Sequence, residues 1–312
     1  MRRRAFLSSA AATLAAAIVP GRGFAAHNPV LRDVPAISRV GKEIVLPKAD
    51  IEDLRRALAG SLLLREDEGY DVARRIWNGA IDRKPALIAR CSTTTDVMHA
   101  VQFAAAHDVL VAVRAGGHSS SGKSMCDGGL VIDLSAMREV NVDPVRRIAS
   151  VQGGALLADL DRAAQAHGLV CTAGTVSHTG IGGLTLGGGF GHLARLYGLT
   201  IDHLRAAEVV TAKGARHLAS ADENPDLFWG VRGGGGNLGI VTSFEFNLHA
   251  FGTTIQRAQL VYPFARARRT LQFLSQYAKQ LPDETTLETA LVSTPSNERI
   301  LSVTIVHAGT IE

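Results

Sequence analysis

Residues 114–122 read Arg-Ala-Gly-Gly-His-Ser-Ser-Ser-Gly and follow an apolar, β-branched segment, 109–115, that predicts a strand. Glycine accompanies apolar strand-like segments twice more, at 174–191 and at 232–241. Glycine after a strand lets backbone N–H groups approach an anion closely, and serine hydroxyls add donors. Tight turns also need glycine, but three such segments between residues 114 and 241 favour a large phosphorylated cofactor over turns alone.

Several nucleotide-binding and hydrolytic classes are not supported by the sequence. Residues 117–124 read Gly-His-Ser-Ser-Ser-Gly-Lys-Ser and match the letters of G-x-x-x-x-G-K-[ST]. In a P-loop a helix follows this sequence directly, whereas here Asp-Gly-Gly follows at 127–129, so a P-loop is not expected. The glycine motif of a dinucleotide-binding fold lies in the first βα turn and is followed by an acidic residue about 20 positions later. The glycines here are instead spread over a segment in which predicted helices and strands are mixed. H-E-x-x-H and G-x-S-x-G are missing from the sequence, which argues against zincins and α/β-hydrolases. No metal site is predicted.

From Lys84 to His249 the chain resembles the PCMH-type FAD-binding domains of the vanillyl-alcohol-oxidase superfamily. Within that group it is similar to the berberine-bridge-enzyme-like and 6-hydroxynicotine-oxidase-like branch. Four motifs carry the resemblance: Val-Arg-Ala-Gly-Gly-His-Ser at 113–119, Asp-Gly-Gly-Leu-Val-Ile-Asp-Leu at 127–134, the glycine-rich stretch 179–199, and Asp-Leu-Phe-Trp through Gly-Ile-Val-Thr at 226–242.

The resemblance implies an α+β fold with a two-subdomain PCMH-type FAD-binding domain over 84–249. An N-terminal arm and the first helix of that domain are expected at 26–83. The start of an antiparallel-sheet substrate domain is expected at 250–312. In relatives this sheet continues further and supplies the catalytic base, so the chain is expected to end partway through the domain, and no catalytic base is named.

The resemblance also assigns FAD as cofactor and His118 as the residue that carries it through the flavin 8α-methyl group. A nucleophilic ring nitrogen needs a neutral, oriented imidazole; the alternatives are non-covalent FAD or a histidine that caps a turn. Relatives with a second covalent link have cysteine where this chain has Val176, so one bond, through His118, is predicted. The expected FAD-binding residues are Arg114, Ala115, Gly116, Gly117, His118, Ser119, Ser120, Gly174, Thr179, Gly180, Gly182, Gly183, Gly239, Ile240 and Val241.

The precise roles of four positions stay open at this level. His178 is a candidate substrate contact or simply a surface histidine. Thr179 does not decide between oxidase and dehydrogenase. Arg114 either faces a phosphate or extends from a strand end. His203 follows Asp202 where relatives usually have asparagine, which weakens any role carried over to it.

The first 25 residues predict an export signal. They contain Arg2, Arg3, Arg4 and Arg22, no acid, and a short Ala-rich apolar run. Arg-Arg-Ala-Phe-Leu resembles the twin-arginine motif, with an ordinary Sec signal as the alternative, and cleavage is expected after Ala25. These four arginines equal the net charge of +4. The rest of the chain is neutral, so no nucleic-acid partner is expected.

The mature protein is expected in the periplasm or outside the cell. No later segment reaches 18 apolar residues, so no membrane association is expected. Cys91, Cys126 and Cys171 are widely spaced and form no C-x-x-C. One disulfide is conceivable, but three buried thiols are the expectation.

Apolar periodicity predicts the main elements. A helix capped by Asp50 would bury Ile51, Leu54, Leu58 and Leu62. The other predicted helices span 94–107, 156–166 and 264–280. The predicted strands span 86–90, 109–115, 129–133, 149–152, 169–173, 206–212, 239–248, 251–262, 285–292 and 300–306.

The sequence therefore predicts an exported FAD-dependent oxidoreductase that takes a hydride from a small organic substrate and is reoxidised by oxygen or another acceptor. Backbone N–H groups at 180–183 would stabilise negative charge on the reduced ring. Two alternatives remain: a non-catalytic or truncated flavin-binding remnant, and a non-covalent FAD reductase. The substrate and the oligomeric state are left open.

Overall fold

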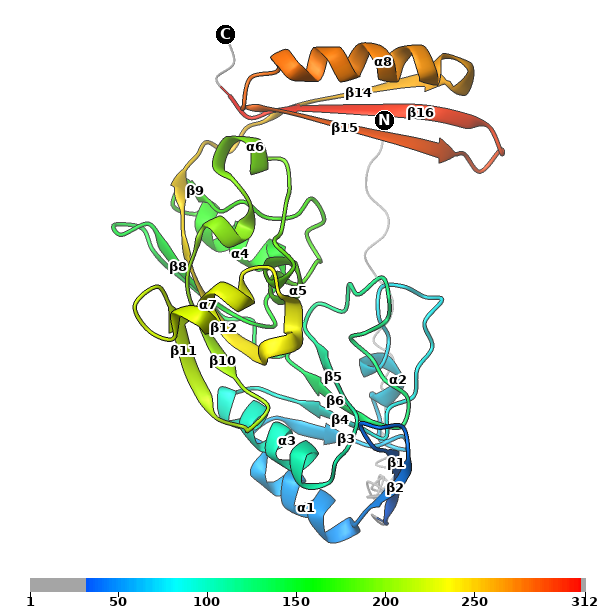
Figure 1. Ribbon diagram of the computed structural model, residues 1–312, viewed down its shortest axis with the longest axis vertical. Helices are drawn as coiled ribbons and strands as arrows, with labels where there is room; N and C mark the ends of the chain where they lie inside the picture. Colours follow the sequence, from blue (N-terminus) through cyan, green and yellow to red (C-terminus); the bar gives the residue numbers. More distant parts are fainter. Residues whose placement is uncertain (1–31, 310–312) are drawn as a thin grey trace, which may run out of the picture. The chain divides into compact units, whose positions relative to one another are not determined.

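The computed structural model describes residues 32–309, whose arrangement is shown in Figure 1. These residues form a mixed α/β fold with five β-sheets. The predicted export signal, residues 1–25, lies outside the described residues.

A four-stranded sheet carries the first glycine-rich segment. Its strands β4 and β5 run parallel to the central β6, and β3 is antiparallel to β4. The order is β3 (Ser61–Leu63), β4 (Leu87–Arg90), β6 (Leu130–Asp133) and β5 (Val111–Arg114). β5 runs directly into Gly116, so this sheet fixes where the glycine segment begins.

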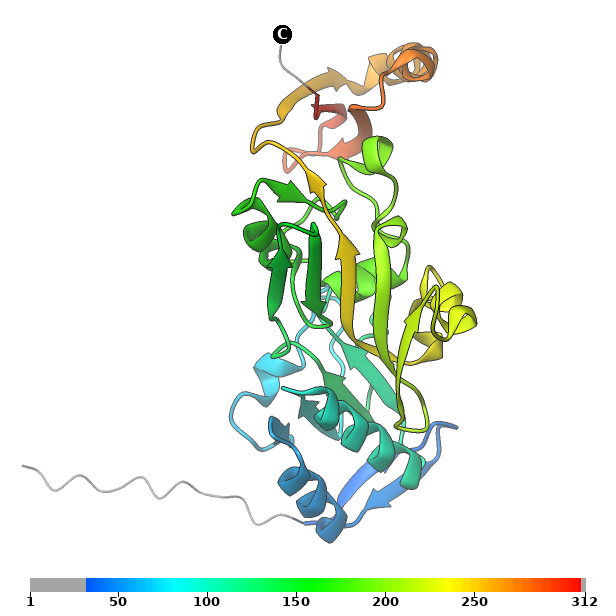
Figure 2. The same cartoon turned by 90° about the vertical axis from the view of Figure 1, so that its left-hand side faces the viewer.

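Helices cover both faces of this sheet, which is why β4 and β6 are apolar on both sides. Ile88 and Val131 pack with Tyr70 of α2 (Tyr70–Ala73). Because side chains alternate along a strand, their neighbours face the other side, where α3 (Thr94–Ala106) packs on β6 and contacts α1 (Lys48–Ala57). Figure 2 shows α1 and α3 side by side.

The start of α3 is set by local chemistry. The Thr93 hydroxyl accepts a hydrogen bond from the Asp96 amide at 3.1 Å, and the Asp96 carboxylate accepts one from the Thr93 amide at 3.3 Å. This reciprocal capping box satisfies two of the backbone donors that a helix start leaves unpaired. Asp96 also accepts hydrogen bonds from the amides of Ala59 and Gly60, so it ties the loop before β3 to this helix.

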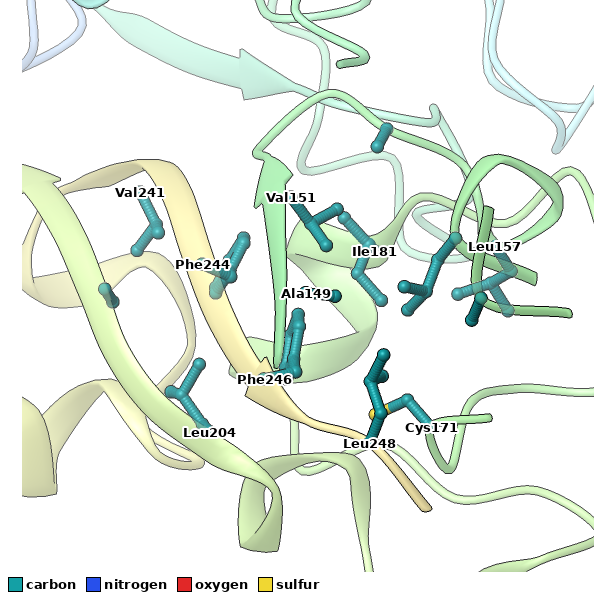
Figure 3. Packing of buried hydrophobic residues seen from close by; sticks show 14 of the residues in the cluster. Ala149, Val151, Leu157, Cys171, Ile181, Leu204, Val241, Phe244, Phe246 and Leu248 are labelled. Atoms are coloured by element: carbon teal, nitrogen blue, oxygen red, sulfur yellow. The ribbon is translucent and has the colours of Figure 1, made fainter. Parts of the chain in front are cut away.

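A five-stranded antiparallel sheet carries the other two glycine-rich segments. Its order is β11 (Arg216–Ser220), β10 (Leu204–Val210), β12 (Ile240–Asn247), β8 (Ile148–Gln152) and β7 (Val140–Asp143). Phe244 and Phe246 project from one face of β12 and stack with ring centroids 5.7 Å apart. They pack with Leu157 of α4 (Leu157–Gln165) and Ile181 of α5 (Ile181–Leu186), as Figure 3 shows. Burial of Ile181 therefore fixes the second glycine segment on this core.

The residues after 250 form a three-stranded antiparallel sheet. Its order is β14 (Gln256–Pro263), β16 (Arg299–His307) and β15 (Thr285–Ser293). Helix α8 (Ala267–Tyr277) lies along one face (Figure 1), with Leu271 and Leu274 packed on Leu301 and Val303. Thr286 donates a hydrogen bond from its hydroxyl to the His192 carbonyl at 2.8 Å, which links this sheet to the segment before α6 (Ala194–Tyr197).

Shorter elements complete the described chain. They are the hairpin β1 (Val34–Ile37) and β2 (Glu43–Leu46), the pair β9 (Leu169–Val170) and β13 (His249–Ala250), the helix α7 (Pro225–Val231), and the 3₁₀ helices η1 (Thr200–Asp202), η2 (Gly235–Leu238), η3 (Phe264–Arg266) and η4 (Ala278–Gln280).

Four predictions of local structure were wrong. The first helix ends at Ala57, and Leu62 lies in β3, because Gly60 packs so tightly on Arg90 that a Cβ would meet its carbonyl at 2.0 Å. Pro47, not Asp50, is its N-cap residue. The predicted helix 264–280 is α8 flanked by two 3₁₀ turns, and the predicted strand 251–262 begins only at Gln256.

Candidate functional site

The first and second glycine-rich segments touch at Gly116 and Gly180. A Cβ on Gly116 would lie 2.3 Å from the Gly180 amide nitrogen, and a Cβ on Gly180 would lie 2.4 Å from the Gly116 amide nitrogen. Such distances are far shorter than van der Waals contact, so only glycine fits at either position. The contact brings the end of β5 against the start of α5.

A cavity of about 370 Å³ opens beside this contact. Five of the predicted site residues line it, together with six residues that were not predicted. The lining residues are Arg114, Ala115, Gly116, His118 and His178, then Ile76, Trp77, Ser135, Arg138, Gly154 and Leu156. A cavity of this size is in the usual range for ligand sites.

His118 contacts two aromatic rings in the wall of the cavity. The Trp77 ring stacks on it with centroids 5.3 Å apart and planes within 17°. The His178 ring meets its edge, with centroids 4.5 Å apart and Nε2 of His118 2.5 Å from Nδ1 of His178. Burial lowers the pKa of His118 below its usual value, and charge repulsion from His178 adds to this effect. His118 is therefore neutral at neutral pH, as a nucleophilic imidazole must be.

Residues 77 and 78 hold the backbone around His118 through two hydrogen bonds. The Trp77 amide donates to the Gly117 carbonyl at 2.9 Å, and the Asn78 side chain donates to the Ser120 carbonyl at 2.8 Å. Gly117 has a φ of +69°, which favours glycine. The Ser119 hydroxyl accepts a hydrogen bond from the Lys123 amide, so it stabilises its own turn. Trp77 and Asn78 gave no signal in the sequence because their segment lacks periodicity.

Arg114 ends β5 with an ion pair to a buried acid. Its Nη1 donates to Oδ1 of Asp133 at 3.0 Å, and Asp133 is 1% exposed. Among residues 32–309, the buried Nε of Arg114 has no hydrogen-bond partner. Arg138 lines the same cavity and forms a bidentate pair with Asp159, with both distances 2.8 Å. The cavity wall therefore carries two guanidinium groups.

The second glycine segment packs on the first through α5. Gly182 faces the Gly153 carbonyl, which a Cβ would meet at 2.8 Å, and lies near Ala115, whereas a Cβ on Gly183 would enter open space. The Thr179 carbonyl accepts a hydrogen bond from the Leu157 amide at 2.9 Å. Gly174 packs on the Leu184 side chain. Thr179, Gly182 and Gly174 thus shape the backbone behind the cavity without lining it.

The third glycine segment is not part of the cavity lining. Gly239 has a φ of +149°, and a Cβ there would lie 2.6 Å from the Val210 carbonyl. Ile240 and Val241 are buried in β12. The Val241 carbonyl packs against Gly153, which in turn packs against Gly182. This segment therefore supports the second one rather than reaching the cavity itself.

The cysteines and His203 are buried structural residues in the described chain. Cys91, Cys126 and Cys171 are free and buried, as predicted. Burial raises the pKa of the Cys126 thiol to about 11 and that of Cys171 to about 12. His203 is 4% exposed, with Nε2 3.1 Å from the Thr172 hydroxyl and Nδ1 3.1 Å from Nε2 of His249.

Known proteins are similar to this chain in fold and in sequence. A family model described as an FAD binding domain matches residues 85–219. An FAD-linked oxidoreductase of Dictyostelium discoideum is 35% identical over 81% of this chain and 56% of its own length. This chain therefore carries an FAD-binding domain and is similar to FAD-linked oxidoreductases of the berberine-bridge-enzyme-like branch.

Solved structures of this family superpose well. The 6-hydroxy-D-nicotine oxidase of Arthrobacter nicotinovorans matches with a TM-score of 0.78 and 31% identity over 81% of this chain and 56% of its own. BBE-like 1 of Physcomitrella patens matches with a TM-score of 0.77 and 25% identity over 84% and 56%. The chain thus spans about half the length of the relatives it matches. No described helix has the length and apolar character needed to span a bilayer.

Proposed function

We propose that this chain binds FAD in the cavity beside the Gly116–Gly180 contact and carries it covalently on His118. The observation that supports this best is the position of His118, a neutral imidazole that contacts both Trp77 and His178 in the cavity wall. The family match over residues 85–219 supports FAD as the cofactor.

The residues around the cavity fit a dinucleotide with a negatively charged pyrophosphate. The unpaired Nε of Arg114 and the guanidinium of Arg138 supply positive charge. Gly116 and Gly180 remove side-chain bulk where the two loops meet, and the open space at Gly183 allows close approach to the backbone. Ala115, Gly117, Ser119, Ser120, Gly174, Thr179 and Gly182 would position these loops, and Gly239, Ile240 and Val241 would support them from β12.

When bound, FAD accepts a hydride from a substrate and passes its electrons to oxygen or another acceptor. The chain's own contribution would be to bind, orient and attach this group. Backbone N–H groups near Gly182 and Gly183 would stabilise negative charge on the reduced ring. The substrate would be a small organic molecule, since the similar solved structures include an oxidase named for 6-hydroxy-D-nicotine.

Three further assignments belong to this proposal. Residues 84–249 would form the two-subdomain FAD-binding domain. The sheet β14–β16–β15 would begin the substrate domain at residues 250–312. Residues 1–25 would direct export, supported by their arginines and their apolar run.

The decisive experiment is acid precipitation of the purified chain, followed by intact-mass analysis beside His118→Ala. His217→Ala is the matched control, because His217 is an exposed histidine outside the cavity lining. We expect a yellow pellet and a mass gain of one FAD in the wild type and the control, both lost in His118→Ala. FAD released into the supernatant would contradict the covalent link but keep FAD binding. No flavin in either fraction would contradict the proposal as a whole.

A further inference from the structure

The closest side-chain contact in the cavity wall joins two histidines from different loops. Nε2 of His118 and Nδ1 of His178 are 2.5 Å apart, in the range of a short hydrogen bond. Two ring nitrogens at this distance must share a proton, since two lone pairs would repel. The contact occupies Nε2 of His118 and leaves its Nδ1 as the nitrogen available to bond to another group.

We propose that His178 is a positioning residue and proton acceptor for the attachment of FAD to His118. His178 would accept a hydrogen bond from Nε2–H of His118 and thereby hold the tautomer in which Nδ1 has a free lone pair. This inference rests on the proposed function, in which His118 carries the flavin.

The attachment reaction needs one oxidant, which is dioxygen. Nδ1 of His118 bonds to the 8α carbon of the flavin, and one C–H bond of that methyl group breaks. The two electrons of the broken C–H bond would reduce the flavin ring, and the proton of that bond would be released to water. Alkylated at Nδ1, His118 would be cationic unless it loses its Nε2 proton, which passes to Nδ1 of His178. Dioxygen then takes the two electrons and two protons as hydrogen peroxide, which restores the oxidised ring.

The surroundings of the two histidines favour transfer of the proton from His118 to His178. His118 is half-buried and its pKa is lowered, so it does not retain a second proton easily. His178 is exposed and can release a proton to water. The charged groups that line the same cavity are Arg114, paired with Asp133, and Arg138, paired with Asp159. Each of these cations is neutralised by its paired carboxylate, so the lowered pKa of His118 comes from burial and from His178.

Two variants of His178 distinguish its role as proton acceptor from its role in positioning His118. His178→Asn puts a carbonyl oxygen near the position of Nδ1, so it can accept the hydrogen bond but cannot take the proton at neutral pH. His178→Ala removes both functions. Loss of a general base typically slows a reaction by about 100-fold or more. The full chain, produced without flavin, is mixed with FAD in air, and acid-precipitable flavin is followed over time, with His217→Ala as control.

We expect both His178 variants to bind FAD reversibly but to attach it about 100-fold more slowly than wild type. Added imidazole should accelerate His178→Ala and not His178→Asn. A merely structural role would not produce this imidazole response.

The outcomes distinguish this inference from the proposal beneath it. Attachment at the wild-type rate in both His178 variants, with His118→Ala still unable to attach FAD, would overturn the role of His178 alone. Slow attachment by His178→Ala that imidazole does not rescue would also overturn it. Covalent flavin in His118→Ala, or no flavin binding by the wild type, would instead contradict the proposed function.

Discussion

Gly116 and Gly180 place two loops in backbone contact, and the two histidines of the cavity wall meet because of it. His118 lies two residues after Gly116, and His178 lies two residues before Gly180. A Cβ at either glycine would overlap the opposing backbone, at 2.3 or 2.4 Å. The separation of the two imidazoles is thus set by a contact that contains no side chain.

Gly116→Ala should therefore lower the free energy of unfolding by about 1–3 kcal/mol, because the loops must separate to admit the methyl group. Gly183→Ala is the control, since its Cβ meets nothing within 4 Å and Gly183 lies in α5. There alanine should be neutral or stabilising by up to about 1 kcal/mol. Urea denaturation of both variants measures the difference, and equal stability of the two would contradict the contact.

Asp133→Asn tests the ion pair that ends β5. Asp133 is fully buried and its partner Arg114 is largely so, and removal of one member of a buried pair costs roughly 3 kcal/mol. The exposed pair Arg32–Glu66 is the matched control, and Glu66→Gln should cost less than about 1 kcal/mol. Denaturant midpoints measure both changes. The double variant Asp133→Asn/Arg114→Met should recover part of the loss; a further, additive loss would argue against direct coupling.

The pair of the buried His203 and the half-buried His249 makes stability depend on pH. Burial lowers the pKa of His203, and His249 adds to this, although Asp202 opposes it. Burial also lowers the pKa of His249, with a contribution from Arg147. The unfolded chain therefore binds more protons than the folded chain below the ordinary value of 6.5. Stability should be complete above pH 6.5 and fall as the pH drops below it.

Urea denaturation between pH 5 and 8 measures this dependence. His203→Asn should flatten the slope between pH 5 and 6.5, since asparagine does not titrate and can still bond to Thr172. His217→Ala, at an exposed position, should keep the wild-type slope. An unchanged slope in His203→Asn would show that another group carries the dependence.

The sequence predicted the framework of the site well because its signals are local. β5 and α3 were predicted within two residues, since both have strong apolar patterns and α3 begins at a capping box. His118 and Gly180 were singled out by motifs. The hairpin of β1 and β2 was missed because its four-residue strands, one of which contains Pro35, lack a strong alternation.

The contacts that complete the site are long-range, and so the sequence could not reveal them. Arg114 meets Asp133 because these residues are partners in the parallel register of β5 and β6. His118 meets His178 only through the Gly116–Gly180 contact. Gly239 was predicted to bind FAD because it lies in a motif. In the structure it packs so tightly on the Val210 carbonyl that only glycine fits there.

Trp77 should control the orientation of His118, and Trp77→Leu tests this. The stacked ring covers one face of the imidazole, and aromatic pairs contribute about 0.5–1.5 kcal/mol beyond area burial. Leucine keeps the backbone hydrogen bond from residue 77 to Gly117 but removes the flat surface. His118 would then sample other rotamers, so attachment of added FAD should slow several-fold, while urea denaturation should show a loss of no more than about 1.5 kcal/mol.

Trp229→Leu is the control for this substitution. Trp229 is 79% exposed on α7 and does not line the cavity. Its replacement should leave the time course of acid-precipitable flavin at the wild-type rate. If Trp77→Leu also attached FAD at that rate, the stack would be a packing contact without influence on the imidazole. If both variants slowed equally, a general effect of tryptophan loss on stability would explain the result, and orientation of His118 by Trp77 would be rejected.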